Sequence, residues 1–204
     1  MEQILGKTTQ WLNADGLASR THGYHHRLVD VGTGDGRFVL AQARTRPDTF
    51  VLGVDACREN LRTAARGAPG NALFLIANAH MLPPSLAALA TEITVNFPWG
   101  SLLTALLDPD RPVADRLAAL AQPGATISLR LNGEALSSNG WSLDAGAAQV
   151  SSVLRRAGFV LSPAQRLDAH ALRTLPTTWA KRLAFGRDPR AVTIQGVFRP
   201  HGCR

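Results

Sequence analysis

A glycine-rich segment with two carboxylates is the first group of residues that could do chemistry. In the stretch LVDVGTGDGR, residues 28–37, glycines stand at alternate positions 32, 34 and 36, and Asp30 and Asp35 lie among them. Glycine has no Cβ atom, so it lets the backbone come close to a ligand. Such a turn after an apolar run is typical of a site for a nucleotide-type cofactor.

The glycine spacing indicates which cofactor this turn would hold. A dinucleotide fingerprint reads Gly-x-Gly-x-x-Gly and rests a pyrophosphate on a helix N-terminus, whereas this segment reads Gly-x-Gly-x-Gly. Two carboxylates would repel a pyrophosphate and attract the ammonium and sulfonium groups of S-adenosylmethionine. Asp55, about twenty residues past the turn, can bind the two ribose hydroxyls. The segment therefore predicts S-adenosylmethionine, with a dehydrogenase or a turn without a ligand as alternatives.

The turn NFPWGS, residues 96–101, follows another apolar run and could face a substrate. Proline stiffens such a turn and has no N–H of its own, so the carbonyl before Pro98 can accept from an exocyclic amine. Trp99 can offer a flat face to a base, although a tryptophan in an apolar context is more often core. The turn is also loosely similar to the Asn-Pro-Pro-Tyr turn of amino-group methyltransferases. That similarity keeps N6 of adenine open as a target.

A second aromatic and basic segment, TTWAKRLAFGRDPR, covers residues 177–190. Aromatic side chains interleaved with basic ones are typical of a site for a stacked base with phosphates nearby. The alternative is an amphipathic helix that buries Trp179, Leu183 and Phe185. Both interpretations hold together if Trp179 stands at the start of the helix.

Most of the positive charge lies in the last quarter of the chain. Residues 151–204 hold 10 basic and 2 acidic side chains, whereas residues 1–150 hold 12 basic and 13 acidic ones. A solvated basic tail is the alternative, but Trp179 and the regular apolar spacing are unlike a tail. The distribution favours a folded basic face suited to phosphates.

Length and composition fit one soluble α/β domain that spans residues 1–204. The chain has 204 residues, of which 45% are hydrophobic and 18% charged, as is ordinary for a globular protein. No apolar run approaches the roughly 20 residues that cross a bilayer, and the first residues lack the order of a signal peptide. Cys57 and Cys203 suggest no disulfide framework. We expect a cytoplasmic protein.

Apolar runs alternate with helix-like stretches along most of the chain, which predicts an open, doubly wound sheet. The strands, rich in Val, Ile, Leu and Phe as in a buried parallel sheet, are expected at 27–31, 50–54, 72–77, 91–97 and 125–131. Helices are expected between them at 37–45, 57–66, 100–107 and 112–121. The last part predicts a helix at 147–157, a strand near 159–162 and an added antiparallel strand at 191–198.

These segments together resemble the aminoglycoside-resistance 16S ribosomal RNA methyltransferases of the KamB/NpmA type. The shared pieces cover nearly the whole chain in family order: Gly6-Lys7, DVGTGDGR, the strand ending in Asp55, IANAHMLP, FPWGSLL and WAKRLAFGR. The last two are the most specific. The resemblance implies an α/β, class I S-adenosylmethionine-dependent methyltransferase fold with a seven-stranded, mostly parallel sheet. It also implies an N-terminal β-hairpin within residues 1–20.

The resemblance further implies methyl transfer to N1 of adenine 1408 in the decoding site of the 30S subunit, and hence aminoglycoside resistance. It places Trp99 and Trp179 on either side of the flipped adenine, with Phe97 and Ser101 beside them. The implied cofactor pocket consists of Asp30, Gly32, Thr33, Gly34, Gly36, Asp55, Ala79, His80, Asn96, Phe97, Pro98, Trp99, Gly100 and Ser101. The implied rRNA-binding residues are Lys7, Lys181, Arg182, Arg187 and Arg190. No metal is implied, and we expect a monomer.

Three features differ from the family pattern. His80 stands where the family usually has an acidic residue, the linker GAPGN replaces a longer lysine-rich segment, and residues 132–150 are short, with Glu134 as a candidate for the functional acid there. These differences motivate two alternatives. One is a methyltransferase for another RNA base or position, such as adenine N6, and the other is a weakly active or inactive RNA-binding homologue.

Overall fold

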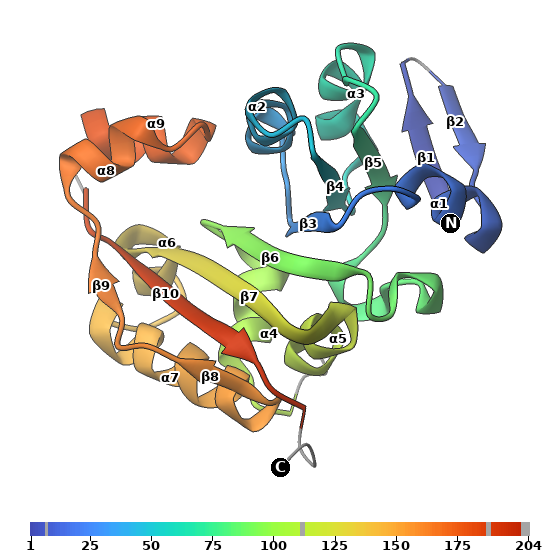
Figure 1. Cartoon of the computed structure of the whole chain (residues 1–204). Coiled ribbons are helices and arrows are strands. Elements are labelled where there is room, and N and C mark those ends of the chain that lie inside the picture. Colours follow the sequence, from blue (N-terminus) through green and yellow to red (C-terminus); the bar gives the residue numbers. More distant parts are fainter. Residues whose placement is uncertain (7, 111–112, 187–188, 201–204) are drawn as a thin grey trace.

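A ten-stranded mixed sheet runs through the computed structural model of the chain (Figure 1). The structure describes residues 1–6, 8–110, 113–186 and 189–200. The strands are β1 (Glu2–Leu5), β2 (Thr8–Trp11), β3 (His26–Val31), β4 (Thr49–Asp55), β5 (Ala72–Ile76), β6 (Ala90–Asn96), β7 (Ala121–Asn132), β8 (Phe159–Leu161), β9 (Gln165–Arg166) and β10 (Ala191–Phe198). The α-helices are α1 (Ala14–Thr21), α2 (Arg37–Thr45), α3 (Arg58–Arg66), α4 (Gly100–Leu107), α5 (Val113–Leu120), α6 (Gly133–Ser137), α7 (Leu143–Arg156), α8 (Ala169–Thr174) and α9 (Thr178–Phe185), with short 3-10 helices η1 (Ala79–Met81) and η2 (Pro84–Leu86).

Five parallel strands form the centre of this sheet. The order is β2-β1-β5-β4-β3-β6-β7-β10-β8, with β9 paired to β10. The five adjacent strands β5, β4, β3, β6 and β7 are parallel to one another. β10 is antiparallel to β7 and β8, as predicted for its sequence. The expected hairpin is β1–β2, and β1 pairs antiparallel with β5. The sheet therefore has more than the seven expected strands. The expected seven are β5, β4, β3, β6, β7, β10 and β8 in spatial order, and β1–β2 and β9 add to them through β5 and β10.

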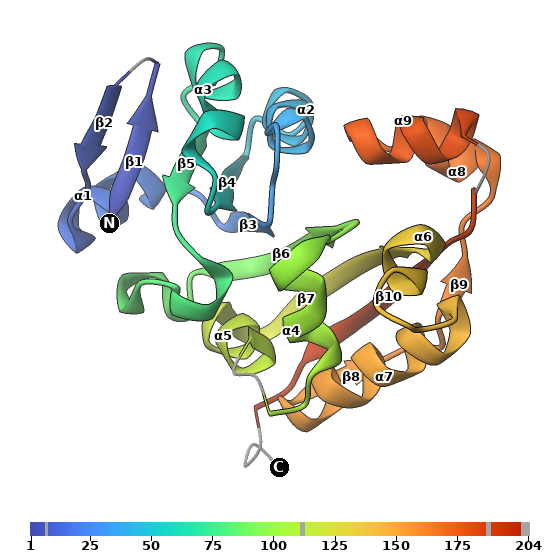
Figure 2. The same ribbon diagram turned by 180° about the vertical axis from the view of Figure 1, so that it is seen from behind.

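Helices cover both faces of the central strands (Figures 1 and 2). On one face α2 and α3 pack over β4 and β5, and Phe38 and Phe74 belong to the buried cluster between them. On the other face α4, α5 and α7 contribute Leu103, Leu117 and Val150 to a larger cluster. Burial on both faces explains why the central strands read as continuous apolar runs.

The alternating elements are confirmed, and two of them begin earlier than predicted. β7 begins at Ala121 because that residue pairs with Ala90 of β6 before a register shift. α7 begins at Leu143, where the Ser142 hydroxyl accepts from Ala145 N. Helices α1, α6 and α8 were not predicted, because α6 and α8 are only five and six residues long and α1 buries only Leu17 and Thr21. Their starts are marked instead by caps, since Asn13, Asn132 and Asp168 each accept from a backbone N–H in the first turn.

The pair α8–α9 lies beyond the carboxyl ends of β6 and β7, on the same side of the sheet as α2 (Figures 1 and 2). Its inner side packs on Phe97, which is 2% exposed, through Leu172, Ala180 and Leu183. The amphipathic-helix interpretation of residues 177–190 is thus confirmed for α9, but Phe185 is exposed rather than buried. This packing holds α9 across the ends of the central strands.

Candidate active site

A cavity of about 530 Å³ opens at the carboxyl ends of β3, β4 and β6. The strand order reverses at β3, because the chain runs from β3 to β4 and β5 on one side of it and then crosses over to β6 and β7 on the other. Open α/β sheets bind their ligands at such a switch point. Every predicted cofactor residue lines this cavity except Gly36 and Gly100. The start of α9 closes it from above through Thr177, Thr178 and Trp179.

The glycines of the first loop have two different roles. Gly32 has φ +75°, a conformation that residues with a side chain rarely adopt, and a Cβ there would also lie 2.5 Å from Leu102 Cδ2, so glycine is strongly favoured at this point of the loop. Gly36 also has positive φ, at +72°, but a Cβ there would lie 2.5 Å from the Cβ of Ala64 on α3. Gly36 is therefore a packing glycine at the start of α2 and not part of the cavity wall.

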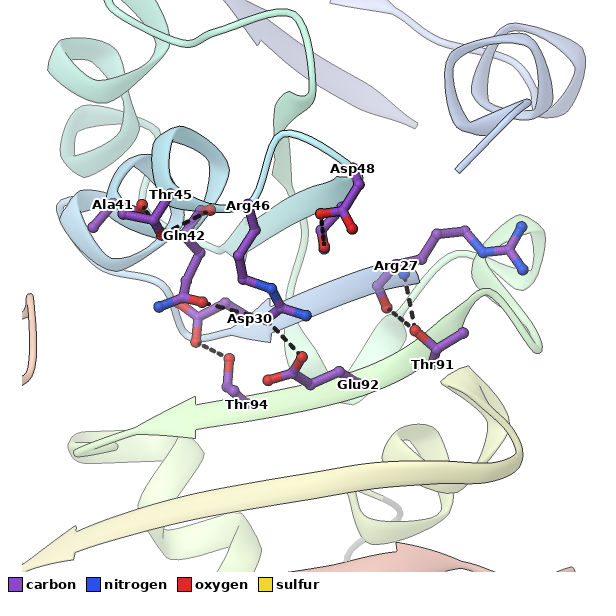
Figure 3. Close-up of polar contacts among 11 residues, drawn as sticks. Arg27, Asp30, Ala41, Gln42, Thr45, Arg46, Asp48, Thr91, Glu92 and Thr94 are labelled. Atoms are coloured by element: carbon purple, nitrogen blue, oxygen red, sulfur yellow. Dashed lines mark hydrogen bonds and ion pairs between the residues drawn. The ribbon is translucent and has the colours of Figure 1, made fainter. Parts of the chain in front are cut away.

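Asp30 forms the floor of the cavity at the end of β3 and is 1% exposed. Its Oδ1 accepts hydrogen bonds from Thr94 Oγ1 at 2.7 Å and Asn96 Nδ2 at 2.8 Å, the first of which is drawn in Figure 3. Its Oδ2 is buried and has no hydrogen-bond partner among the described residues. Burial raises the pKa of Asp30, opposed by the nearby Thr33 hydroxyl, by the hydrogen bonds from Thr94 and Asn96, and by the charge of Arg130. Such an oxygen is suited to a cationic ligand group.

Asp55 ends β4 on another side of the cavity and orders the backbone around it. Its Oδ2 accepts from Gly34 N at 2.8 Å and its Oδ1 from Cys57 N at 2.8 Å. Each carboxylate oxygen can accept a further hydrogen bond, as the predicted ribose contact requires. The side chain also holds the glycine loop against the start of α3. This bridging role was not predicted from the sequence.

Asp35 lies at the rim of the cavity and not on its floor. Its Oδ2 accepts from Thr178 Oγ1 at 2.5 Å and lies 3.3 Å from Arg37 Nε. The carboxylate thus fastens the first residue of α9 to the glycine loop. Its charge is paired with Arg37, so Asp30 is the acid on the cavity floor.

The turn after β6 is held in a strained form by its neighbours. Phe97 has φ +52°, which is unusual for a residue with a side chain, and its N–H donates to the Arg130 carbonyl at 2.8 Å. Asn96, Pro98 and Ser101 line the cavity as predicted. Burial of the Phe97 ring under α8–α9 offsets the backbone strain, and the turn is thereby fixed relative to both β7 and α9.

Trp99 and Trp179 lie together at the mouth of the cavity, as the resemblance implied, but they stack directly on one another. Their ring centroids are 4.9 Å apart and their planes are inclined by 26°. The guanidinium of Arg182 lies 5.0 Å from the centroid of the Trp179 ring. The two indoles and the arginine form one aromatic and basic group between the turn and α9.

The predicted rRNA-binding residues are placed unevenly. Arg182 lines the cavity, whereas Lys181 and Arg190 are exposed and do not line it. Lys7 and Arg187 lie outside the described residues. In the part of the chain that the structure describes, no three His, Cys, Asp or Glu side chains gather as a metal site needs. No helix there is long and apolar enough to span a bilayer.

Comparisons with known proteins identify the family. The model of the NpmA family, described as 16S rRNA (adenine(1408)-N(1))-methyltransferase, matches residues 2–198. The chain belongs to this family. A 16S rRNA (adenine(1408)-N(1))-methyltransferase of Escherichia coli is 30% identical over 219 residues, covering 97% of this chain and 99% of the relative.

Solved structures agree with this assignment to the NpmA family. The 16S rRNA methyltransferase KamB is 28% identical with a TM-score of 0.87, covering 98% of this chain and all of KamB. The antibiotic-resistance methyltransferase Kmr is 32% identical with a TM-score of 0.81, over 99% of this chain and all of Kmr. The predicted class I methyltransferase fold is confirmed, and the dehydrogenase alternative is wrong for a member of this family.

Two contacts of this NpmA-family site were missed from the sequence. Thr178 was not predicted to bind Asp35, although a Thr-Thr pair before an apolar run is a signal for a helix start. Arg130 was not predicted to support Asn96, although a charged residue inside the apolar run ATISLRL stands out. Both contacts join segments far apart in the chain, so only the fold brings the partners together.

Proposed function

We propose that this chain transfers the methyl group of S-adenosylmethionine to N1 of adenine 1408 in 16S rRNA of the 30S subunit and so confers aminoglycoside resistance. The observation that carries the proposal is the meeting of two features in one cavity. The buried carboxylate of Asp30 forms its floor, and the Trp99–Trp179 pair with Arg182 forms its mouth. Relatives named as methyltransferases for this adenine support the choice of target.

The residues of the floor fit this methyl donor. The cavity volume of about 530 Å³ lies in the range of about 300–1,000 Å³ that is usual for small-molecule sites. Asp30 Oδ2 offers a buried, unpartnered acceptor charge to the donor's ammonium or sulfonium, and Asp55 can accept from its ribose. When bound, S-adenosylmethionine supplies an electrophilic methyl group. Asp30 and Asp55 would orient it toward the turn at Pro98.

The residues of the mouth would bind and orient the base. Adenine N1 carries a free lone pair, so the chain needs no general base, and its work is to align the base and exclude water. Flipping the base out costs a few kcal/mol, and stacking returns about 1–3 kcal/mol per base. A base between two indoles needs them about 7 Å apart, twice the spacing of stacked bases. Trp99 and Trp179 must therefore separate before the adenine can enter.

The contacts of Asn96 favour N1 over N6 as the target. Transfer to an exocyclic amine is helped by an acceptor for its protons. The Asn96 Oδ1 instead accepts from Arg130 Nη1 at 2.6 Å, and its Nδ2 donates to Asp30. Both polar atoms of the Asn96 side chain are thus already hydrogen-bonded, which makes its oxygen a weaker acceptor for an amine.

The proposed product accounts for resistance in physical terms. Adenine methylated at N1 is a cation and has lost the N1 acceptor. An aminoglycoside is itself polycationic, so it would lose a hydrogen bond and meet like-charge repulsion in the decoding site.

Primer extension on 30S subunits tests the proposal. Purified protein with S-adenosylmethionine should produce a reverse-transcription stop at adenine 1408, because N1 methylation blocks base pairing and N6 methylation does not. Reactions without the donor are the control. Full read-through by a protein that binds the donor in calorimetry would support the inactive RNA-binding homologue instead. Methylation detected without a stop would support N6.

A further inference from the structure

Arg130 connects the methyl-donor floor to the base-site turn from behind. It lies on β7 directly opposite Asn96 in the parallel register. Its Nη1 donates to Asn96 Oδ1 at 2.6 Å, and its carbonyl accepts from Phe97 N at 2.8 Å. Arg130 does not line the donor cavity, so it does not contact the proposed ligands there.

The chemistry of the three side chains leaves one orientation for the amide between them. A guanidinium can only donate hydrogen bonds and a carboxylate can only accept them. Asn96 must therefore turn Oδ1 toward Arg130 and Nδ2 toward Asp30, as observed. If Arg130 were absent, the carboxylate alone would constrain the amide. The Asn96 oxygen would then have no fixed partner and the amide could tilt about its contact with Asp30.

The same hydrogen bonds, from Arg130 to Asn96 and from Asn96 to Asp30, determine which oxygen of Asp30 is left for a ligand. Asn96 and Thr94 both donate to Oδ1, whereas Oδ2 accepts no hydrogen bond among the described residues, although the Thr33 hydroxyl lies close to the carboxylate. Two donors on one oxygen also fix the plane of the carboxylate.

We infer that Arg130 is a positioning residue for the methyl donor, which orients Asn96 so that the Asp30 carboxylate presents Oδ2 to the cavity. The inference rests on the proposed function for the identity of the donor. It adds a residue on a strand behind the cavity whose removal weakens donor binding without touching the donor. It also explains why a charged residue stands near the end of an apolar strand.

Calorimetry of S-adenosylmethionine binding to the purified protein tests this inference without any methylation assay. Arg130→Met keeps the length of the side chain and removes its donors, and it should weaken donor binding about tenfold, as for a hydrogen bond to a charged group. Arg130→Lys keeps one donor and should recover most of that loss. The matched control is Arg46→Met, because Arg46 is a half-buried arginine that pairs with Glu92 at 2.8 Å (Figure 3). It should bind the donor within about twofold of wild type.

A double-mutant cycle separates positioning from general damage. If Arg130 acts through Asn96, the Arg130→Met change should have little further effect in an Asn96→Ala background. In steady-state kinetics the KM for the donor should rise, whereas the KM for 30S subunits stays constant. Additive losses in the cycle, or wild-type donor binding by Arg130→Met, would overturn the inference. Should Arg130→Met not fold, Arg130→Lys and Arg130→Gln in the same cycle give the same decision.

The proposed function can be disproved independently of the role of Arg130. Wild-type protein that binds the donor but leaves 30S subunits unmethylated would end the proposed function. The calorimetric result would still decide the role of Arg130.

Discussion

The floor and the roof of the active-site cavity are built in different ways. The floor consists of strand ends, and Asp30 there is 1% exposed and held by Thr94 and Asn96. The roof is the eight-residue helix α9, which rests on a small apolar cluster. Two further contacts attach it to the rest of the site, one from Thr178 to Asp35 and one between Trp179 and Trp99.

The difference follows from the tasks of the two regions. A small cationic donor is best bound by a rigid, desolvated carboxylate, which a parallel sheet can hold. In the proposed function a base enters from outside between two rings that touch in this structure, and this would require the roof to move. Elements with few buried contacts are the ones that open at low cost. The floor is therefore expected to set donor affinity, and the roof is expected to set the use of RNA.

The largest expected effect is the loss of the charge on the floor. Asp30→Asn removes the carboxylate proposed to face the donor, and we expect donor binding to fall at least about 100-fold, because an interaction with a buried charge is lost. Calorimetry with S-adenosylmethionine measures this. Asp15→Asn, on exposed α1 far from the cavity, is the control. Near wild-type affinity in Asp30→Asn would place the donor's positive groups elsewhere.

The raised pKa of Asp30 gives the floor a pH dependence. Burial lifts it above the ordinary 3.8, and the neutral form has no charge for the donor. Donor binding should therefore weaken as pH falls, beginning at higher pH than for an ordinary aspartate. The free energy of unfolding of the donor-free protein has the opposite pH dependence. A raised pKa of the Asp30 carboxyl stabilises the fold at low pH, and this contribution is lost as pH rises through the pKa of the folded state. Calorimetric affinities at about pH 8 and about pH 5 test this, and Asp30→Asn should abolish the pH dependence of binding.

The floor was also the region that the sequence predicted well. Asp30 and Asp55 stand at the ends of apolar runs, and local spacing is enough to place strand ends at one edge of a parallel sheet. Residues of the turn after β6 could be placed for the same reason. The polar contacts behind them were not predictable, because Arg130 meets Asn96 only through the pairing of β6 with β7.

The roof was predicted in composition but not in arrangement. The segment around Trp179 indicated base stacking and phosphate binding, and α9 does reach the cavity. Local spacing does not tell whether two tryptophans about eighty residues apart in the chain leave a gap or touch. Gly36 is a residue for which the sequence predicted a site role that the structure does not support. It belongs to the glycine pattern, but its neighbours Ala64 and Phe74 give it a packing role.

The next largest effect is expected at the roof. Trp179→Ala should lower methylation of 30S subunits about 10- to 100-fold, the equivalent of about 1–3 kcal/mol of base stacking. Donor binding should stay within a few-fold of wild type, because Asp30 is unchanged. Phe185→Ala is the control, since this ring lies on the same helix, is 78% exposed and does not line the cavity. Unchanged methylation by Trp179→Ala would remove the base from the proposed site.

A smaller effect is expected for the basic side chain of the roof. Arg182→Gln should weaken 30S binding and reduce the slope of log affinity against log salt concentration by about one, as for one lost phosphate contact. The measurement is a binding titration at several salt concentrations. Arg155→Gln on α7, on the opposite face of the sheet, should leave the slope unchanged. Equal slopes for both variants and wild type would make Arg182 a packing partner of Trp179 alone.

The smallest effect should come from the contact that joins roof and floor. Thr178→Val keeps the shape of the side chain and removes its hydrogen bond to Asp35. Because this bond is exposed and Trp179 still rests on Trp99, α9 should open more often without losing its place. We expect the donor to dissociate about two- to fivefold faster in stopped-flow experiments, the effect of one modest hydrogen bond. Thr178→Ser restores the hydroxyl and should restore the wild-type rate. A donor dissociation rate that does not respond to either change would show that the roof opens without breaking this bond, and that α8–α9 is held by the Phe97 cluster instead.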